Sequence, residues 1–100
     1  MNVETSKIKS YVGFAIKSKH IKYGVDEILK MKFADVILFS NSLGNSSREK
    51  LLAFSKNTNS KIFEFEEDVF DEIASNNKNL KAVAITDKNL ANAIKKIMTE

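Results

Sequence analysis

The apolar residues of this chain follow helical spacing in some segments and form short continuous or alternating runs in others. Residues 5–17 show the helical spacing most clearly, because their apolar positions recur at intervals of three and four. Gly13 lies inside this predicted helix and suggests close packing against a neighbouring element. The side chains predicted to form the buried stripe are Ile8, Tyr11, Val12, Ala15 and Ile16.

A second helix is predicted directly after Gly24. Residues 21–23 form a short extended piece, and the chain then changes to helical spacing until about Lys32. A glycine at such a junction is typical of a helix boundary. The residues predicted to face inward from this helix are Val25, Ile28 and Leu29.

Three more helices are predicted in the second half of the chain. Residues 46–49 match a capping box, which predicts a helix from there to about Lys56. Residues 67–74 form a short amphipathic helix, and Asp87 is placed to cap a final one. The inward-facing residues of the last two helices are predicted to be Val69, Phe70, Ile73, Ala74, Leu90, Ala91, Ile94 and Ile97.

Three apolar runs predict strands between these helices. Residues 36–39 are continuously apolar and partly β-branched, which is typical of a central strand buried on both faces. Residues 61–65 alternate in polarity, and residues 81–85 form another buried strand. Because helices and strands alternate, the sequence predicts an α/β fold, with a mostly buried sheet between helix layers. We expect one domain that spans residues 1–100.

The composition narrows the classes of function. With 100 residues, 43% hydrophobic and 29% charged, the chain is long enough for one compact core. The absence of cysteine excludes disulfides, iron–sulfur clusters, thiolate zinc sites and cysteine nucleophiles, and it fits a cytoplasmic protein. No apolar run approaches the roughly 20 residues of a membrane span, and the N-terminus lacks the regions of a signal peptide. We therefore expect a soluble, cytoplasmic protein that is not exported.

The formal net charge of +3 is small but unevenly distributed. Residues 5–32 carry seven lysines against Asp26 and Glu27, whereas residues 61–75 carry one lysine against six acidic residues. A basic surface is the electrostatic footprint of a protein that binds polyanions. Because the net charge is modest, the shape of the surface must supply much of any specificity.

The basic residues gather around the predicted helix start at Gly24. A helix N-terminus presents unpaired N–H groups and partial positive charge, which attract phosphate. Asp26 and Glu27 would place two carboxylates in the first turn of that helix. Two interpretations remain open. The acids and lysines either stabilise and solvate a surface helix, or form a nucleic-acid site in which lysines bind phosphates and one carboxylate accepts a hydrogen bond from a base edge.

Catalytic and metal sites are not favoured by the sequence. His20 is the sole histidine, and no serine has a second imidazole to activate it. The acidic residues between Glu64 and Glu72 lack fixed ligand spacing, so a solvated surface is favoured over a metal site. The loop at residues 40–45 leads from a strand to a helix as in an anion site, but it lacks the Walker lysine, and Gly44 is interpreted as a turn residue. We predict a non-enzyme without a metal or cofactor.

Four segments carry a family resemblance over nearly the whole chain. Tyr11–Gly24, Phe33–Ser40, Asn41–Ser46 and Ala82–Asp87 are similar, in this order, to the L-seven-Ae and L-thirty-e ribosomal protein superfamily, and most of all to its bacterial YlxQ-type branch. The resemblance implies a three-layer α/β/α sandwich with a central mixed sheet of about four strands. It also implies binding of kink-turn RNA, a sharply bent duplex with tandem sheared G·A pairs beside a bulge.

The same resemblance implies roles for individual residues. The family's Gly-x-Asn-Glu motif falls on residues 24–27, and a following lysine falls on Lys30. Gly24 would allow a close approach of the RNA to the protein backbone. Glu27 would accept a hydrogen bond from a guanine of a sheared pair, and Lys30 would contact a base edge or phosphate. Asp26 stands where kink-turn binders often have asparagine. In the loop before the last strand, only Leu80 could provide the apolar cover that relatives place over a bulged nucleotide.

Taken together, these features predict a non-enzymatic, monomeric RNA-binding protein of the translation apparatus that does not bind membranes. Its partners would be ribosomal or other kink-turn-like structured RNA, and the ribosome or translation factors. The alternative is a protein-interaction or regulatory member of the same fold that docks through its acidic surface at Glu66, Glu67, Asp68 and Glu72. The predicted RNA-binding residues are Lys17, Lys19, Lys22, Gly24, Asp26, Glu27, Lys30 and Leu80.

Overall fold

The computed structural model of the protein describes residues 3–74 and 79–99. Helices and strands alternate along this part of the chain, as the apolar spacing predicts. The elements are α1 (Val3–Lys17), β1 (Ile21–Tyr23), α2 (Val25–Leu29), β2 (Val36–Ser40), α3 (Asn45–Thr58), β3 (Lys61–Phe65), α4 (Glu67–Ile73), β4 (Ala82–Ile85) and α5 (Lys88–Thr99).

The four strands form one mixed sheet in the order β1-β4-β2-β3. β2 and β3 are parallel, with Val36 opposite Lys61, whereas β4 is antiparallel to both β1 and β2. The two inner strands, β2 and β4, are buried at every position, because helices cover both faces of the sheet. The predicted central position of residues 36–39 is confirmed.

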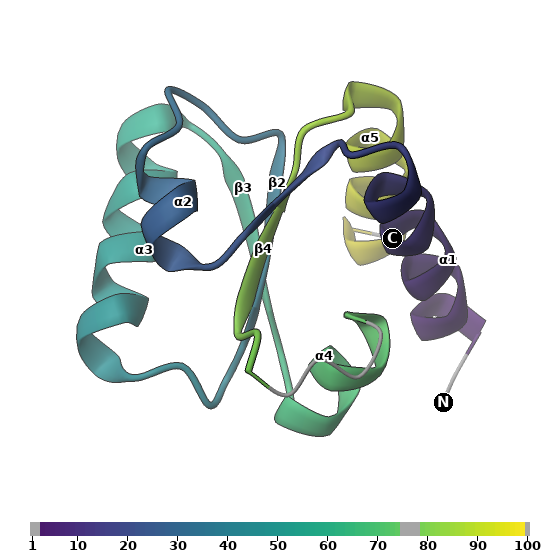
Figure 1. The fold of residues 1–100 in the computed structure, drawn as a ribbon, viewed down its shortest axis with the longest axis horizontal. Coiled ribbons are helices and arrows are strands. Elements are labelled where there is room, and N and C mark those ends of the chain that lie inside the picture. The colour runs from purple at the N-terminus through teal and green to yellow at the C-terminus, as the bar shows by residue number, and fades with distance from the viewer. Residues whose placement is uncertain (1–2, 75–78, 100) are drawn as a thin grey trace.

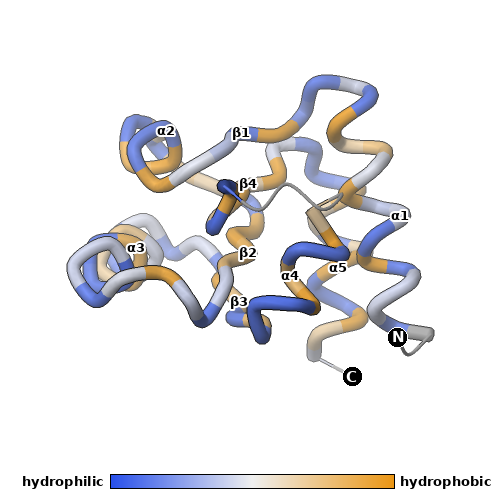
Figure 2. Tube along the Cα trace, turned by 60° about the horizontal axis from the view of Figure 1, so that its bottom comes forward, coloured by the Kyte–Doolittle hydropathy of each residue, from blue (hydrophilic) through white to orange (hydrophobic). Residues whose placement is uncertain are grey.

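The sheet separates two layers of helices, so the expected three-layer α/β/α architecture is confirmed. α1, α4 and α5 cover one face, and α2 and α3 cover the other (Figure 1). The side chains of successive β2 residues point to opposite faces of the sheet, and each face has its own hydrophobic core. Leu38 packs into the core between the sheet and α1, and Phe39 packs into the core between the sheet and α3. Figure 2 shows the apolar positions of the helices turned toward the sheet.

Helix boundaries differ from the predictions most clearly at the start of α3 and the end of α2. The predicted capping box is wrong, because α3 begins at Asn45 after Gly44 and has no side-chain cap hydrogen bond, so residues 46–49 lie inside its first turns. α2 is shorter than predicted and ends at Leu29. Its last turn tightens, with the N–H of Lys30 bonded to the carbonyl of Glu27 at 3.3 Å, three residues back. By contrast, the predicted cap at Asp87 is confirmed, since its Oδ1 accepts from the N–H of Leu90 at 2.9 Å.

The packing role predicted for Gly13 is also wrong. A Cβ atom added to Gly13 would meet no atom within 4 Å apart from its own helix and chain neighbours. Gly13 therefore does not allow a close helix contact, and its presence in a helix interior needs another explanation.

Candidate nucleic-acid interface

The candidate site begins on β1, a short edge strand between the two helix layers. Ile21 is buried, and the next two residues, Lys22 and Tyr23, are exposed. β1 runs antiparallel to β4, with Tyr23 opposite Val83. The strand crosses in front of β4 in Figure 1 and joins the end of α1 to the start of α2. It therefore carries one lysine and one aromatic ring onto the surface directly before Gly24.

Gly24 forms the junction between β1 and α2. Its φ of 85° and ψ of 156° lie in a region that only glycine occupies readily. Its N–H donates to the carbonyl of Ala82 at 2.9 Å, and its carbonyl accepts from the N–H of Ile28 at 3.1 Å. The helix start has no side-chain cap, so the N–H groups of its first turn are left for solvent or a ligand. Because α2 has only five residues, its dipole is small, and the neighbouring side chains must supply most of the electrostatic attraction.

Two exposed carboxylates, those of Asp26 and Glu27, lie in the first turn of α2. Glu27 Oε1 is 3.7 Å from Lys30 Nζ, and both side chains are mostly exposed. An ion pair of this kind is worth little in water and yields readily to a ligand. Asp26 forms no hydrogen bond or ion pair with any residue in the described ranges. The two predicted readout residues, Glu27 and Lys30, are thus brought together, while Asp26 stands beside them unpaired.

Lys19 lies in the turn between α1 and β1 with a backbone conformation that lysine rarely adopts. Its φ is 61°, in the left-handed region. The N–H of His20 bonds to the carbonyl of Ala15 at 2.9 Å, and the N–H of Lys19 bonds to that of Ile16 at 3.2 Å. These two bonds form a helix-ending motif in which the left-handed position is usually glycine. The chain therefore carries an exposed cation where glycine would be more stable.

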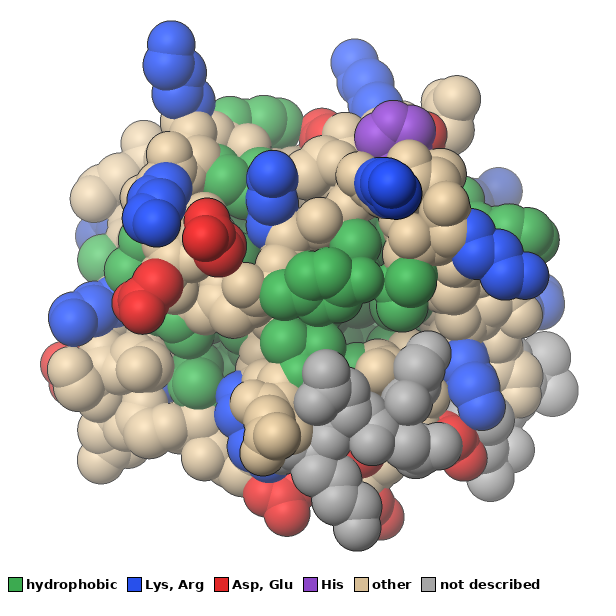
Figure 3. Space-filling model, viewed as in Figure 1, with side chains coloured by type: hydrophobic (Ala, Val, Ile, Leu, Met, Phe, Trp, Pro, Cys, Tyr) green, Lys and Arg blue, Asp and Glu red, His purple; other side chains and the backbone are tan. Residues whose placement is uncertain are grey.

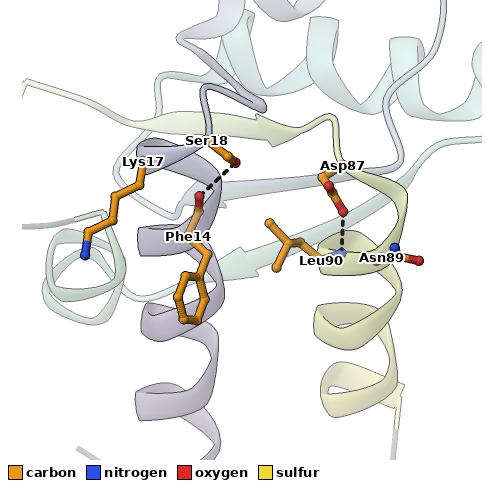
Figure 4. Close-up of a pocket in the computed structure, with 6 residues that line it drawn as sticks. All are labelled: Phe14, Lys17, Ser18, Asp87, Asn89 and Leu90. Atoms are coloured by element: carbon orange, nitrogen blue, oxygen red, sulfur yellow. Dashed lines mark hydrogen bonds between the residues drawn. The ribbon is translucent and has the colours of Figure 1, made fainter.

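Lys17 lies away from the start of α2. Lys17 is one of the residues that line a groove of about 470 Å³ between α1 and α5, and its side chain points away from α5 (Figure 4). The other lining residues come from the end of α1 and the start of α5. They are Phe14, Ser18, Asp87, Asn89 and Leu90. Lys17 is thus separated from Gly24 by the turn and by β1, and it belongs to a second part of the surface.

The expectation that Leu80 covers a bulged nucleotide is corrected by its burial. Leu80 is only 9% exposed and packs into the core cluster under α1, α4 and α5. Its backbone lies near the site, since Ala82 two residues later binds Gly24, but its side chain points into the protein. Residues 77 and 78 of the same loop lie outside the described residues.

Tyr23 is a candidate that the sequence analysis missed. Tyr23 is 46% exposed and stands directly beside Gly24. The signal was present in the sequence, where Tyr23 stands directly between Lys22 and Gly24. Figure 3 shows hydrophobic side chains at the centre of this face, lysines around them, and acidic side chains over α2.

His20 has neighbours that suggest a catalytic triad, but their geometry does not match one. Ser18 Oγ lies 3.0 Å from His20 Nδ1, and Asp87 Oδ2 lies 3.7 Å from the same nitrogen. In a triad, the serine and the acid contact opposite nitrogens of the ring. The three side chains instead join the end of α1 to the start of α5.

The acidic surface around α4 is partly paired with lysines. Glu67 lies 3.7 Å from Lys81, and Glu72 lies 3.1 Å from Lys9. Within residues 3–74 and 79–99, no three histidine, aspartate or glutamate side chains converge to hold a metal ion. In the same described ranges, no helix has the length and apolar character needed to cross a membrane.

Comparisons with known proteins support the fold. No family model and no curated protein matches the sequence. Among solved structures, the chain is similar to a protein of unknown function from Bacillus halodurans, with a TM-score of 0.81 and 12% sequence identity. The match covers 93% of this chain and 97% of the other. At this level of identity the similarity extends to the fold alone.

Proposed function

We propose that this protein is a non-enzymatic RNA-binding protein of the translation apparatus, a member of the superfamily that its sequence resembles. Its ligand would be kink-turn-like or other structured RNA, bound on the surface formed by β1 and the start of α2. The observation that carries the proposal is the group of exposed side chains, Tyr23, Glu27 and Lys30, that surrounds the backbone junction at Gly24. We further propose that the protein acts as a monomer in the cytoplasm, on ribosomal RNA or with translation factors.

Each side chain of this surface suits a different part of an RNA. Lys19 and Lys22 would bind phosphates and so position the RNA without reading its sequence. Glu27, as an ionised carboxylate, can only accept hydrogen bonds and would therefore read a donor on a base edge. Such edges are exposed in bent or unpaired RNA, whereas a regular duplex hides them in a deep groove. The ring of Tyr23 would provide a face for a splayed base.

The alternative, docking of a protein on the acidic surface, has less support. Glu67 and Glu72 have lysine partners that neutralise part of the acidic surface, although these surface ion pairs, like that of Glu27 and Lys30, would yield to a ligand. No comparable internal partner occupies Lys19 or Lys22 among the described residues.

The proposal predicts a preference for bent RNA. A kink-turn RNA should bind more tightly than a straight duplex of equal length, because only the bent form exposes base edges to Glu27. If three or four phosphates are neutralised, the affinity should fall about tenfold or more between about 50 and 200 mM salt. Titration of both RNAs at the two salt concentrations measures this directly. Equal affinity for the two shapes would reduce the site to a basic surface without specificity.

Substitutions of Lys19 distinguish an effect on phosphate binding from an effect on the stability of the fold. Lys19→Gly should raise the melting temperature by about 5 °C, because glycine relieves about 1 kcal/mol of strain at the left-handed position. The same variant should weaken binding to all structured RNAs and lower the slope of log affinity against log salt by about one. Lys19→Ala is the matched control, since it removes the charge and keeps the strain. If Lys19→Gly binds RNA as well as the wild type while its melting temperature rises, Lys19 makes no phosphate contact.

A further inference from the structure

A second exposed aromatic ring, that of Phe14, lies on the outer surface of α1. It is 58% exposed, the highest value among the large hydrophobic side chains in the described ranges. Phe14 lines the groove of about 470 Å³ between α1 and α5 and also a second hollow of about 330 Å³ on the other side of α1. Lys17, one helical turn further along α1, lines both as well. The ring therefore lies between the two hollows, and the side chain of Lys17 extends on the side of α1 that faces away from α5 (Figure 4).

The second hollow exists partly because residue 13 is glycine. Gly13 lines it together with Lys9 and Ser10, and a Cβ atom at this position would project into open space. Glycine in the interior of a helix lowers stability relative to alanine. No neighbouring element packs so closely against residue 13 that a side chain would be excluded. The visible structural consequence of the glycine is that the surface beside the Phe14 ring stays open.

We propose that Phe14 is a stacking platform for unpaired bases of RNA, with a base against each side of the ring and Lys17 bound to the phosphate between them. This inference rests on the RNA-binding function proposed above and extends it, because it makes the preferred ligand a structured RNA with a single-stranded extension. The extension would run from β1 past the turn at residues 18–20 to the outer surface of α1.

The lining of the two hollows favours a nucleobase over a peptide helix. A helix in a groove needs several apolar anchors along its length, whereas here only Phe14 is well exposed and Leu90 is half-buried. The remaining lining includes Ser10, Ser18 and Asn89, which offer donors and acceptors to base edges. It also includes one carboxylate, Asp87, whose Oδ1 accepts from the N–H of Leu90. An aromatic face surrounded by hydrogen-bonding groups and cations is the usual way in which proteins bind single-stranded nucleic acid.

The direct test uses a single-stranded RNA hexamer that contains 2-aminopurine, whose fluorescence is quenched by stacking. The wild type should quench it on binding, and Phe14→Ala should bind at least about tenfold more weakly, since each stacked base contributes roughly 1–3 kcal/mol. Phe14→Trp should retain binding because it keeps a ring. Leu52→Ala removes another exposed hydrophobic side chain, 44% exposed on α3 across the sheet, and should leave the affinity unchanged. Equal hexamer binding by Phe14→Ala and the wild type would overturn the inference.

A substitution at Gly13 provides a second test, in which a loss of binding could not be explained by unfolding. Gly13→Leu should raise the melting temperature by about 3 °C or more, because leucine is a better helix former than glycine. It should nevertheless weaken hexamer binding several-fold, because the new side chain fills the hollow beside Phe14. A stabilised variant with unchanged hexamer affinity would show that the hollow holds no base.

Failure of this inference and failure of the proposed function give different results. The kink-turn RNA is measured with and without a short single-stranded extension, on the wild type and on Phe14→Ala. If the extension improves wild-type binding about tenfold and Phe14→Ala loses only that gain, both ideas stand. If the RNA binds but the extension adds nothing, the Phe14 surface is not an RNA site, and a protein partner becomes the better explanation. If neither kinked RNA binds but the hexamer binds through Phe14, the kink-turn function fails and the stacking site stands.

Discussion

Gly24→Ala is expected to lower the melting temperature by about 10 °C. The backbone at Gly24 has φ 85° and ψ 156°, and a residue with a Cβ atom is held there at a cost of about 1–3 kcal/mol. In a domain of this size, 1 kcal/mol corresponds to about 4–8 °C in melting temperature. The cost arises from the backbone conformation, because a Cβ atom at Gly24 would meet no other atom within 4 Å. Thermal unfolding followed by circular dichroism measures the change.

Gly44→Ala is the matched control for this experiment. Gly44 also precedes a helix without a side-chain cap, and a Cβ atom there would also meet open space. Its φ of −62° is ordinary, so alanine should lower stability by only a few tenths of a kcal/mol, or about 2 °C. Equal effects of the two substitutions would show that the positive φ of Gly24 is not what constrains the junction. If Gly24→Ala relaxes the junction, its affinity for kinked RNA should fall as well.

Glu27→Ala is expected to weaken binding of the kinked RNA by about 1–3 kcal/mol, which is roughly fivefold to 150-fold. The direction of the change is informative. Glu27 is negatively charged and lies 3.7 Å from Lys30, so its removal reduces repulsion of phosphates and frees a lysine. A purely electrostatic surface would therefore bind RNA more tightly after the substitution. Weaker binding by a variant that keeps its melting temperature indicates that Glu27 accepts a hydrogen bond from a base.

Asp26→Asn provides the comparison on the same helical turn. It also removes one negative charge but leaves Glu27 in place, and its amide adds a donor. It should tighten binding of the kinked RNA, and by more at low salt than at high salt, because the repulsion is screened over about 10 Å at 0.1 M. Opposite signs for Glu27→Ala and Asp26→Asn would support specific readout. Tighter binding by both variants would contradict it and leave nonspecific charge as the explanation.

The amino-acid sequence by itself determined the local elements and the faces that they bury. The continuous run of β2 identified a strand covered on both sides, and Asp87 marked the start of α5 through its own side chain. These features depend on periodicity and on contacts within a few residues, which local sequence records. Local reasoning misplaced the start of α3, because the sequence is compatible with more than one helix start there. The capping-box pattern at residues 46–49 predicted one start, whereas α3 begins earlier, directly after Gly44.

Only the tertiary structure decided how distant residues share a surface. The insertion of β4 between β1 and β2 brings Ala82 against Gly24, and it turns Leu80 into the core although its loop lies beside the site. The left-handed turn at Lys19 separates Lys17 from α2, and the packing of α1 against α5 places Lys17 on the groove that α5 also lines. Strand order and the direction of a turn depend on contacts between residues far apart in sequence, which apolar spacing does not specify, because the same spacing is compatible with several arrangements of the strands.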